Sequence, residues 1–143
     1  MDTLMKHGTI NEKRKVMYID IDGVLVSLSK PRGNERYPIL VPDAIKFLEW
    51  VIKTGFKCKY LTCWREQELI KEFPQLPKFE HIKWRNLKTE GINFRESFYW
   101  LEDGCISDEY DVLKEKKALD SYIYIDPDDD NFLTKIMETY ENK

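Results

Sequence analysis

Short apolar runs alternate along the chain with amphipathic segments. Residues 16–21 form an apolar run with β-branched and aromatic side chains, which is typical of a parallel strand covered on both faces. Residues 43–53 repeat apolar side chains at helical spacing between Pro42 and Gly55, which predicts an amphipathic helix. A second strand is expected over residues 56–62, so the chain begins as a β-α-β unit.

The alternation continues to the C-terminus. Further strands are expected over residues 79–84, 97–101 and 122–125, the first of them weakly marked. Further helices are expected over residues 66–73, 109–119 and 132–140. This order predicts an α/β fold, in which an open Rossmann-like parallel sheet carries helices on both faces.

Length and composition favour one domain. The 143 residues suit a single core, with residues 1–14 as a flexible or peripheral N-terminal segment. With 23 basic and 26 acidic residues, bulk charge predicts no membrane or nucleic-acid partner, although a local patch leaves nucleic acid open. The absence of an apolar run of bilayer length and the three cysteines, an odd number, favour a cytoplasmic protein with reduced thiols.

The most informative stretch places two carboxylates at the end of the first strand. Side chains in a strand repeat with a period of two, so Asp20 and Asp22 are expected on one side if the strand persists that far. Converging acids repel each other and lose hydration, which favours a bound cation. The two histidines, His7 and His81, have no partner at ligand spacing, so a Cys/His metal site is not expected.

Two further polar clusters follow later strands. Thr62 ends the second predicted strand, and Glu102 and Asp103 follow the strand over residues 97–101. Each cluster alone is explained as well by a helix cap or a turn. Ligands of open parallel sheets bind beyond the carboxyl ends of the strands, so the shared position favours one site.

Residues 20–25, with the sequence Asp-Ile-Asp-Gly-Val-Leu, resemble the first motif of the haloacid dehalogenase superfamily of phosphohydrolases. Thr62 after an apolar strand resembles the second motif, Lys88 the third, and the pair Glu102 and Asp103 the fourth. The resemblance therefore extends from Tyr18 to Asp103.

For the third and fourth motifs, the chain offers a second set of candidate residues. Lys83 is a second choice for the third motif, although it falls in a predicted strand. The acidic run over residues 126–130 also follows a strand and competes with Glu102 and Asp103, and the family more often has aspartate where this chain has Glu102. We prefer Glu102 and Asp103, because Lys88 precedes them at a suitable distance.

The resemblance implies a phosphatase that works through a covalent intermediate. Asp20 would attack phosphorus to form an aspartyl-phosphate, and Asp22 would act as general acid and base. Thr62 and Lys88 would bind the phosphoryl oxygens. The resemblance also implies Mg²⁺, held by Asp20, the backbone carbonyl of Asp22, and the acidic pair.

The segments between motifs are too short for a sizeable cap domain. Residues 24–41 suffice for a hairpin flap, and residues 63–87 for little beyond a helix and a weak strand. An open site suggests a bulky phosphorylated substrate, such as a protein or a nucleic-acid end, or a homo-oligomer whose neighbouring subunit covers the site. The substrate-binding candidates are Gly23, Arg32, Cys63 and Trp64.

Other classes of protein also handle phosphoryl groups with cysteine or strand-end carboxylates. A thiol phosphatase is excluded, because no cysteine is followed after five residues by arginine. A phosphoacceptor signalling domain would also use strand-end carboxylates, yet Asp22 favours turnover. The alternatives that stay open are a polynucleotide-end phosphatase and a catalytically silent binding module, both within the same fold.

Overall fold

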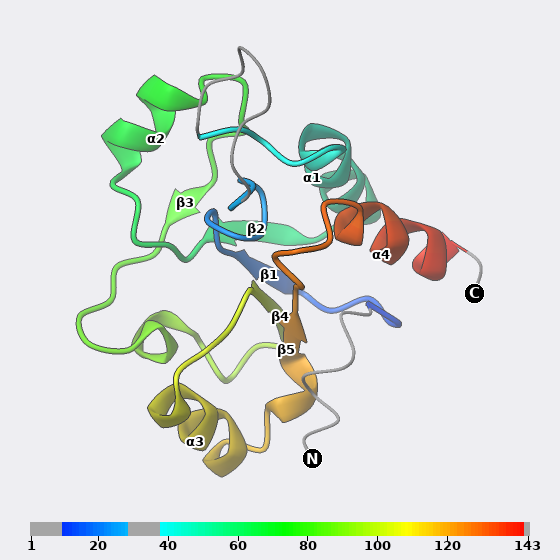
Figure 1. The fold of residues 1–143 in the computed structure, drawn as a ribbon. Coiled ribbons are helices and arrows are strands. Elements are labelled where there is room, and N and C mark those ends of the chain that lie inside the picture. The colour runs from blue at the N-terminus through cyan, green and yellow to red at the C-terminus, as the bar shows by residue number, and fades with distance from the viewer. Residues whose placement is uncertain (1–9, 29–37, 142–143) are drawn as a thin grey trace.

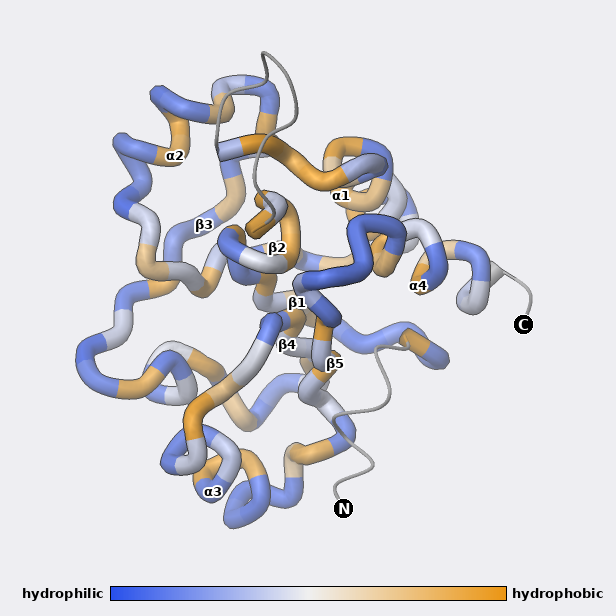
Figure 2. Tube along the Cα trace, viewed as in Figure 1, coloured by the Kyte–Doolittle hydropathy of each residue, from blue (hydrophilic) through white to orange (hydrophobic). Residues whose placement is uncertain are grey.

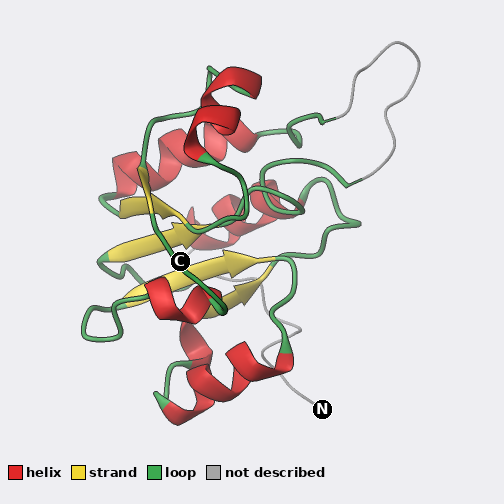
Figure 3. Cartoon of the chain, turned by 90° about the vertical axis from the view of Figure 1, so that its left-hand side faces the viewer, coloured by secondary structure: helices red, strands yellow, loops and turns green. Residues whose placement is uncertain are grey.

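The computed structural model describes residues 10–28 and 38–141. Within them, five parallel strands form one open sheet in the order β3-β2-β1-β4-β5. The strands are β1 (Val16–Ile19), β2 (Lys57–Tyr60), β3 (Glu80–His81), β4 (Phe98–Glu102) and β5 (Tyr122–Tyr124). Figure 3 shows their arrows pointing the same way, so the carboxyl ends of all strands meet at one edge.

Helices cover both faces of the sheet, as the sequence predicts. The helices are α1 (Ala44–Thr54), α2 (Glu66–Glu72), α3 (Ser107–Glu115) and α4 (Phe132–Glu141). Figure 1 shows α1 and α4 side by side on one face, α3 on the other, and α2 near the β3 edge. The predicted α/β class with an open parallel sheet is confirmed.

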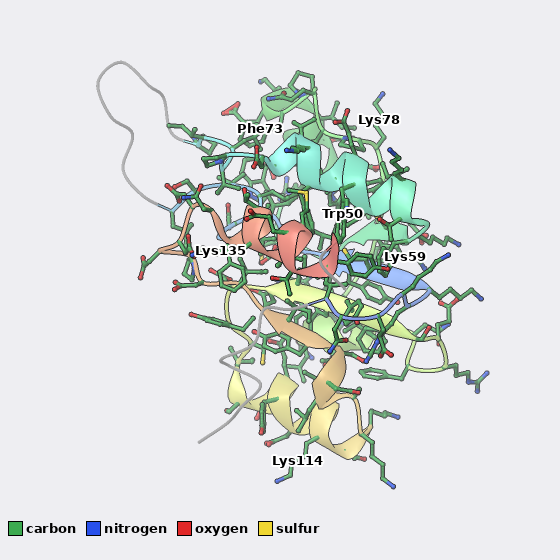
Figure 4. The ribbon with its side chains drawn as sticks, turned by 90° about the vertical axis from the view of Figure 1, so that its right-hand side faces the viewer. Trp50, Lys59, Phe73, Lys78, Lys114 and Lys135 are labelled. Carbon is green, nitrogen blue, oxygen red and sulfur yellow. The ribbon has the colours of Figure 1, made fainter. Side chains whose placement is uncertain are left out.

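The central strand explains why the sheet needs both layers. All four residues of β1 are buried, and they alternate between two core clusters. Met17 and Ile19 pack toward α1 and α4, whereas Val16 and Tyr18 pack on the face that α3 covers. On the first face, the Trp50 ring lies between α1 and α4, with its centroid 5.2 Å from that of Tyr140 (Figure 4).

Strand β1 is shorter than the sequence suggests. The predicted strand over residues 16–21 ends at Ile19, and the chain then turns back on itself. The carbonyl of Ile21 accepts hydrogen bonds from the N–H groups of Val24, Leu25 and Val26. The strand does not persist to Asp22, so the condition for strand pleating to carry Asp20 and Asp22 to one side is not met, and Asp22 belongs to this turn.

The segments that flank the first motif are tied to the domain where they are described. Ile10 is fully buried, and the guanidinium of Arg14 donates to the Ser121 hydroxyl at 2.7 Å. The two arms of the predicted flap pair at their base, where Ser27 N–H donates to the carbonyl of Ile39 at 2.8 Å. No helix in the described part of the chain is long and apolar enough to cross a membrane.

The three cysteines lie at different depths, which gives a test of this arrangement. Cys58 on β2 is buried, and burial raises the pKa of its thiol to about 12. Cys63 is exposed. Because only the thiolate reacts, we expect iodoacetamide at pH 8 to label Cys63 in the native protein about tenfold faster or more than Cys58.

Peptide mass spectrometry after a time course of labelling measures both rates. Cys105 is half-buried, with a pKa raised by burial to about 11, and should also react slowly. In denaturant the three rates should converge. Equal labelling of Cys58 and Cys63 in the native protein would contradict the burial of β2.

Candidate functional site

The centre of the site is a buried lysine between two buried carboxylates. The Nζ atom of Lys88 donates to Asp20 Oδ2 at 2.9 Å and to Glu102 Oε1 at 2.7 Å. Asp20 follows β1, Glu102 ends β4, and Lys88 begins the short 3-10 helix η2 (Lys88–Gly91). Three segments far apart in the sequence therefore meet at the carboxyl edge of the sheet.

The position of this cluster follows from the strand order. The chain places β2 and β3 on one side of β1, and β4 and β5 on the other. The strand order therefore reverses between β1 and β4, and open parallel sheets bind ligands at such a switch point, beyond the carboxyl ends of the strands. Asp20 follows β1 and Glu102 ends β4, so their carboxylates lie at that switch point.

The second oxygen of each carboxylate is held by backbone. Asp20 Oδ1 accepts from the N–H of Ile21 at 2.7 Å, and Glu102 Oε2 accepts from the N–H of Asp103 at 3.0 Å. The main chain is fixed as well, since the N–H of Asp20 donates to the carbonyl of Leu101 at 3.1 Å. Both carboxylates are thereby oriented before any ligand arrives.

A buried carboxylate on α3 holds the lysine in place. Glu109 is 7% exposed, and its Oε2 accepts from the N–H of Lys88 at 2.7 Å. Its Oε1 accepts from the N–H of Ile106 at 3.1 Å, which caps the start of α3. Sequence analysis missed this role, although a glutamate in the first turn of a helix is a known capping signal.

The cluster carries more negative than positive charge. Burial by itself lowers the pKa of Lys88, but the charges of Asp20 and Glu102 outweigh it and raise that pKa above the ordinary value. Burial, a hydrogen bond with Asp103 and the charge of Asp20 raise the pKa of Glu102, and Lys88 opposes them only in part. One ammonium does not neutralise this group of acids, so it attracts a proton or a cation.

Three carboxylates at this edge could share a metal ion. Asp20, Glu102 and Asp103 each offer an oxygen atom, and these atoms lie within 4.8 Å of one another. Gly23 allows this approach: its φ angle is 78°, and a Cβ atom at this position would overlap the carboxylate of Asp103. The donor set therefore fits a hard cation that prefers oxygen ligands.

The rival acidic run lies outside this group. In the loop that follows β5, Asp126 Oδ1 accepts from the N–H of Asp128 at 2.9 Å, and Asp129 pairs with Lys135 at 2.6 Å. Figure 2 shows this loop between β5 and α4 as hydrophilic. Glu102 and Asp103, not residues 126–130, accompany Asp20.

Asp22 has a separate environment from the other acids. Its side chain is exposed on the turn after β1 and is not part of the three-carboxylate group. Its Oδ1 accepts a hydrogen bond from the indole Nε1–H of Trp64 at 3.0 Å. The expected contribution of its backbone carbonyl to a metal site stays a prediction.

The remaining candidates gather around the end of β2. Thr62 is 6% exposed, and its Oγ1 accepts from the backbone N–H of Trp64 at 3.2 Å. Its carbonyl accepts from the indole of Trp84 at 3.2 Å, a contact that sequence analysis did not anticipate. Cys63 is exposed beside Thr62, and Arg32 lies outside the described residues.

The two candidate lysines differ in their surroundings. Lys83 is exposed after β3, whereas Lys88 is 9% exposed and contacts two carboxylates. Nothing in the sequence marks the 3-10 turn that carries Lys88 inward. Its position relative to Asp20 could be guessed only from the resemblance.

Comparison with known proteins adds no further constraint on the site. A scan against protein-family models and searches of curated proteins and of solved structures found no match to this chain.

Proposed function

We propose that the protein is a magnesium-dependent phosphatase of the haloacid dehalogenase kind, which hydrolyses a phosphomonoester. The observation that carries the proposal is the contact of Lys88 with both Asp20 and Glu102. These residues belong to three separate motifs of the sequence, and they converge at the switch point of the strand order, where open parallel sheets bind ligands. Glu102, at a position where the family more often has aspartate, takes part in this convergence.

In the first step, Asp20 acts as the nucleophile. One of its carboxylate oxygens forms a bond to phosphorus while the bond between phosphorus and the leaving oxygen breaks. Lys88 supports this step, because its ammonium offsets the repulsion between the Asp20 carboxylate and the anionic phosphoryl group. Burial of the pair strengthens that effect.

Asp22 moves the protons of the reaction. Its proton passes to the leaving oxygen as that oxygen departs with the alcohol. Water then attacks phosphorus and returns a proton to Asp22, and the bond between phosphorus and Asp20 breaks to release inorganic phosphate. The exposed position of Asp22, outside the lysine and carboxylate cluster, suits a group that exchanges protons with substrate and water.

Thr62 supplies a donor to the phosphoryl group. Its Oγ1 accepts the N–H of Trp64 through a lone pair, so the hydroxyl hydrogen is still available for donation to another acceptor. A phosphoryl oxygen held above Asp20 at the same sheet edge would be that acceptor.

Mg²⁺ fits the three-carboxylate group. Asp20, Glu102 and Asp103 would hold it, and when bound it supplies positive charge that neutralises phosphoryl oxygens. The net negative charge of the cluster supports a cation at this position.

The nucleophile assignment predicts the effect of Asp20→Asn. Magnesium-dependent hydrolysis of 4-nitrophenyl phosphate should fall by about 10³-fold or more, because the amide cannot form the covalent intermediate. The fold should persist, since the amide keeps the size of the side chain and Lys88 keeps Glu102 as a charged partner. Steady-state assays and thermal melting measure the two effects.

A matched substitution of the same type controls this experiment. Asp126→Asn changes an acid of the rival run, and its activity should equal that of wild type. Hydrolysis by Asp20→Asn at the wild-type rate would contradict the nucleophile assignment.

The metal assignment predicts a stability difference. Mg²⁺ at 100 times its dissociation constant should stabilise the wild type by about 2.7 kcal/mol, because it binds only the folded site. Glu102→Gln removes one charged ligand and should lose most of this gain. Asp126→Asn should retain it, as measured by denaturant unfolding with and without Mg²⁺.

The opposite stability result would assign the metal site to the loop after β5 instead. A gain lost in Asp126→Asn and kept in Glu102→Gln would show that the acidic pair had been misassigned. Calcium in place of magnesium serves as a test of size preference within the same assay.

A further inference from the structure

We infer that Trp64 is a positioning residue that holds the carboxylate of Asp22 in the orientation needed for proton transfer. This inference rests on the proposed function and deepens it, because it assigns a role to a side chain that the motifs do not cover. From sequence, Trp64 was only a candidate for substrate contact.

Trp64 is itself held at several points, which a positioning residue requires. Its backbone N–H donates to Thr62 Oγ1 at 3.2 Å, and its ring lies 5.8 Å from the Phe73 ring, measured between centroids. It is partly buried against the core cluster on the α1 face. The indole Nε1–H that reaches Asp22 Oδ1 at 3.0 Å therefore extends from an anchored side chain.

Asp22 needs such a partner more than the other acids do. Asp20 and Glu102 are buried and contact Lys88, whereas Asp22 lies exposed on the turn after β1. A hydrogen bond to Oδ1 restricts rotation of the carboxylate and leaves Oδ2 to face the leaving oxygen. General acid catalysis depends on this geometry, since the proton must be within hydrogen-bond reach of the departing group.

The type of donor matters as well as its position. An indole N–H only donates a hydrogen bond, and near neutral pH it neither takes up nor releases a proton. Trp64 therefore does not compete for the proton that Asp22 transfers. Lysine or arginine would also hold the carboxylate, but would place a full positive charge beside it. Trp64 orients the acid without adding a charge or a titrating group.

The chain provides a matched control for this inference. Trp84 is also partly buried, and its indole N–H donates to the backbone carbonyl of Thr62 at 3.2 Å. It therefore makes the same kind of bond beside the same site, but to a group that transfers no proton. Trp64→Phe and Trp84→Phe each keep an aromatic ring, remove the N–H donor and lose the same side-chain volume, so the two variants differ only in which hydrogen bond is lost.

The first measurement compares two substrates that differ in their leaving groups. Phenyl phosphate has a poor leaving group, which needs a proton from the general acid. The leaving group of 4-nitrophenyl phosphate depends much less on that proton. For Trp64→Phe, kcat/KM with phenyl phosphate should fall about tenfold, and that with 4-nitrophenyl phosphate by less than about threefold. For Trp84→Phe, any loss should be equal for both substrates.

The second measurement follows the hydrogen bond without turnover. In ¹H–¹⁵N spectra, the indole signal of Trp64 should move upfield in Asp22→Ala, which truncates an exposed side chain, while the signal of Trp84 stays in place. Equal losses for the two substrates in Trp64→Phe would overturn the inference, and so would an unmoved Trp64 signal. An inactive wild type would overturn the proposed phosphatase function, and the indole signal would still decide whether Trp64 holds Asp22.

Discussion

The ammonium of Lys88 between Asp20 and Glu102 is the interaction on which the site depends. Without it, two carboxylates from adjacent strands would face each other in a buried space, and losing one partner of a buried ion pair typically costs about 3–5 kcal/mol. The same ammonium is the group best placed to meet an anionic substrate. One contact thus serves both the fold and the proposed chemistry.

The elements of the fold are largely predictable from sequence, and the reason is the covered parallel sheet. Strands buried on both faces leave apolar runs, and helices that cover them leave periodic patterns, as in β1 and α1. The edge of the sheet is predicted less well from the sequence. The strand expected over residues 79–84 is only Glu80–His81 in the structure. A two-residue edge strand buries too few side chains for a hydrophobic pattern in the sequence to show where it begins and ends.

Some residues of the candidate site are likewise predictable from sequence, and others are not. Asp20 and Thr62 could be located from sequence because each follows a recognisable strand. The inward turn at Lys88 and the support from Glu109 could not, because both depend on contacts between segments far apart in the chain. Asp22 shows a third case, in which the residue was found but the reason given for its position, strand pleating, was replaced by a turn.

Glu109 gives α3 a function beyond covering the sheet. Each oxygen of its carboxylate receives one backbone N–H, from the segment that carries Lys88 and from the start of α3. Glutamine has the same shape, but its amide nitrogen is a hydrogen-bond donor. It would face one of these N–H groups, which is also a donor, so that hydrogen bond would be lost. Position 109 therefore discriminates between two isosteric side chains, and any force that displaces α3 is transmitted to the backbone of the lysine through the hydrogen bond that the Lys88 N–H donates to Glu109.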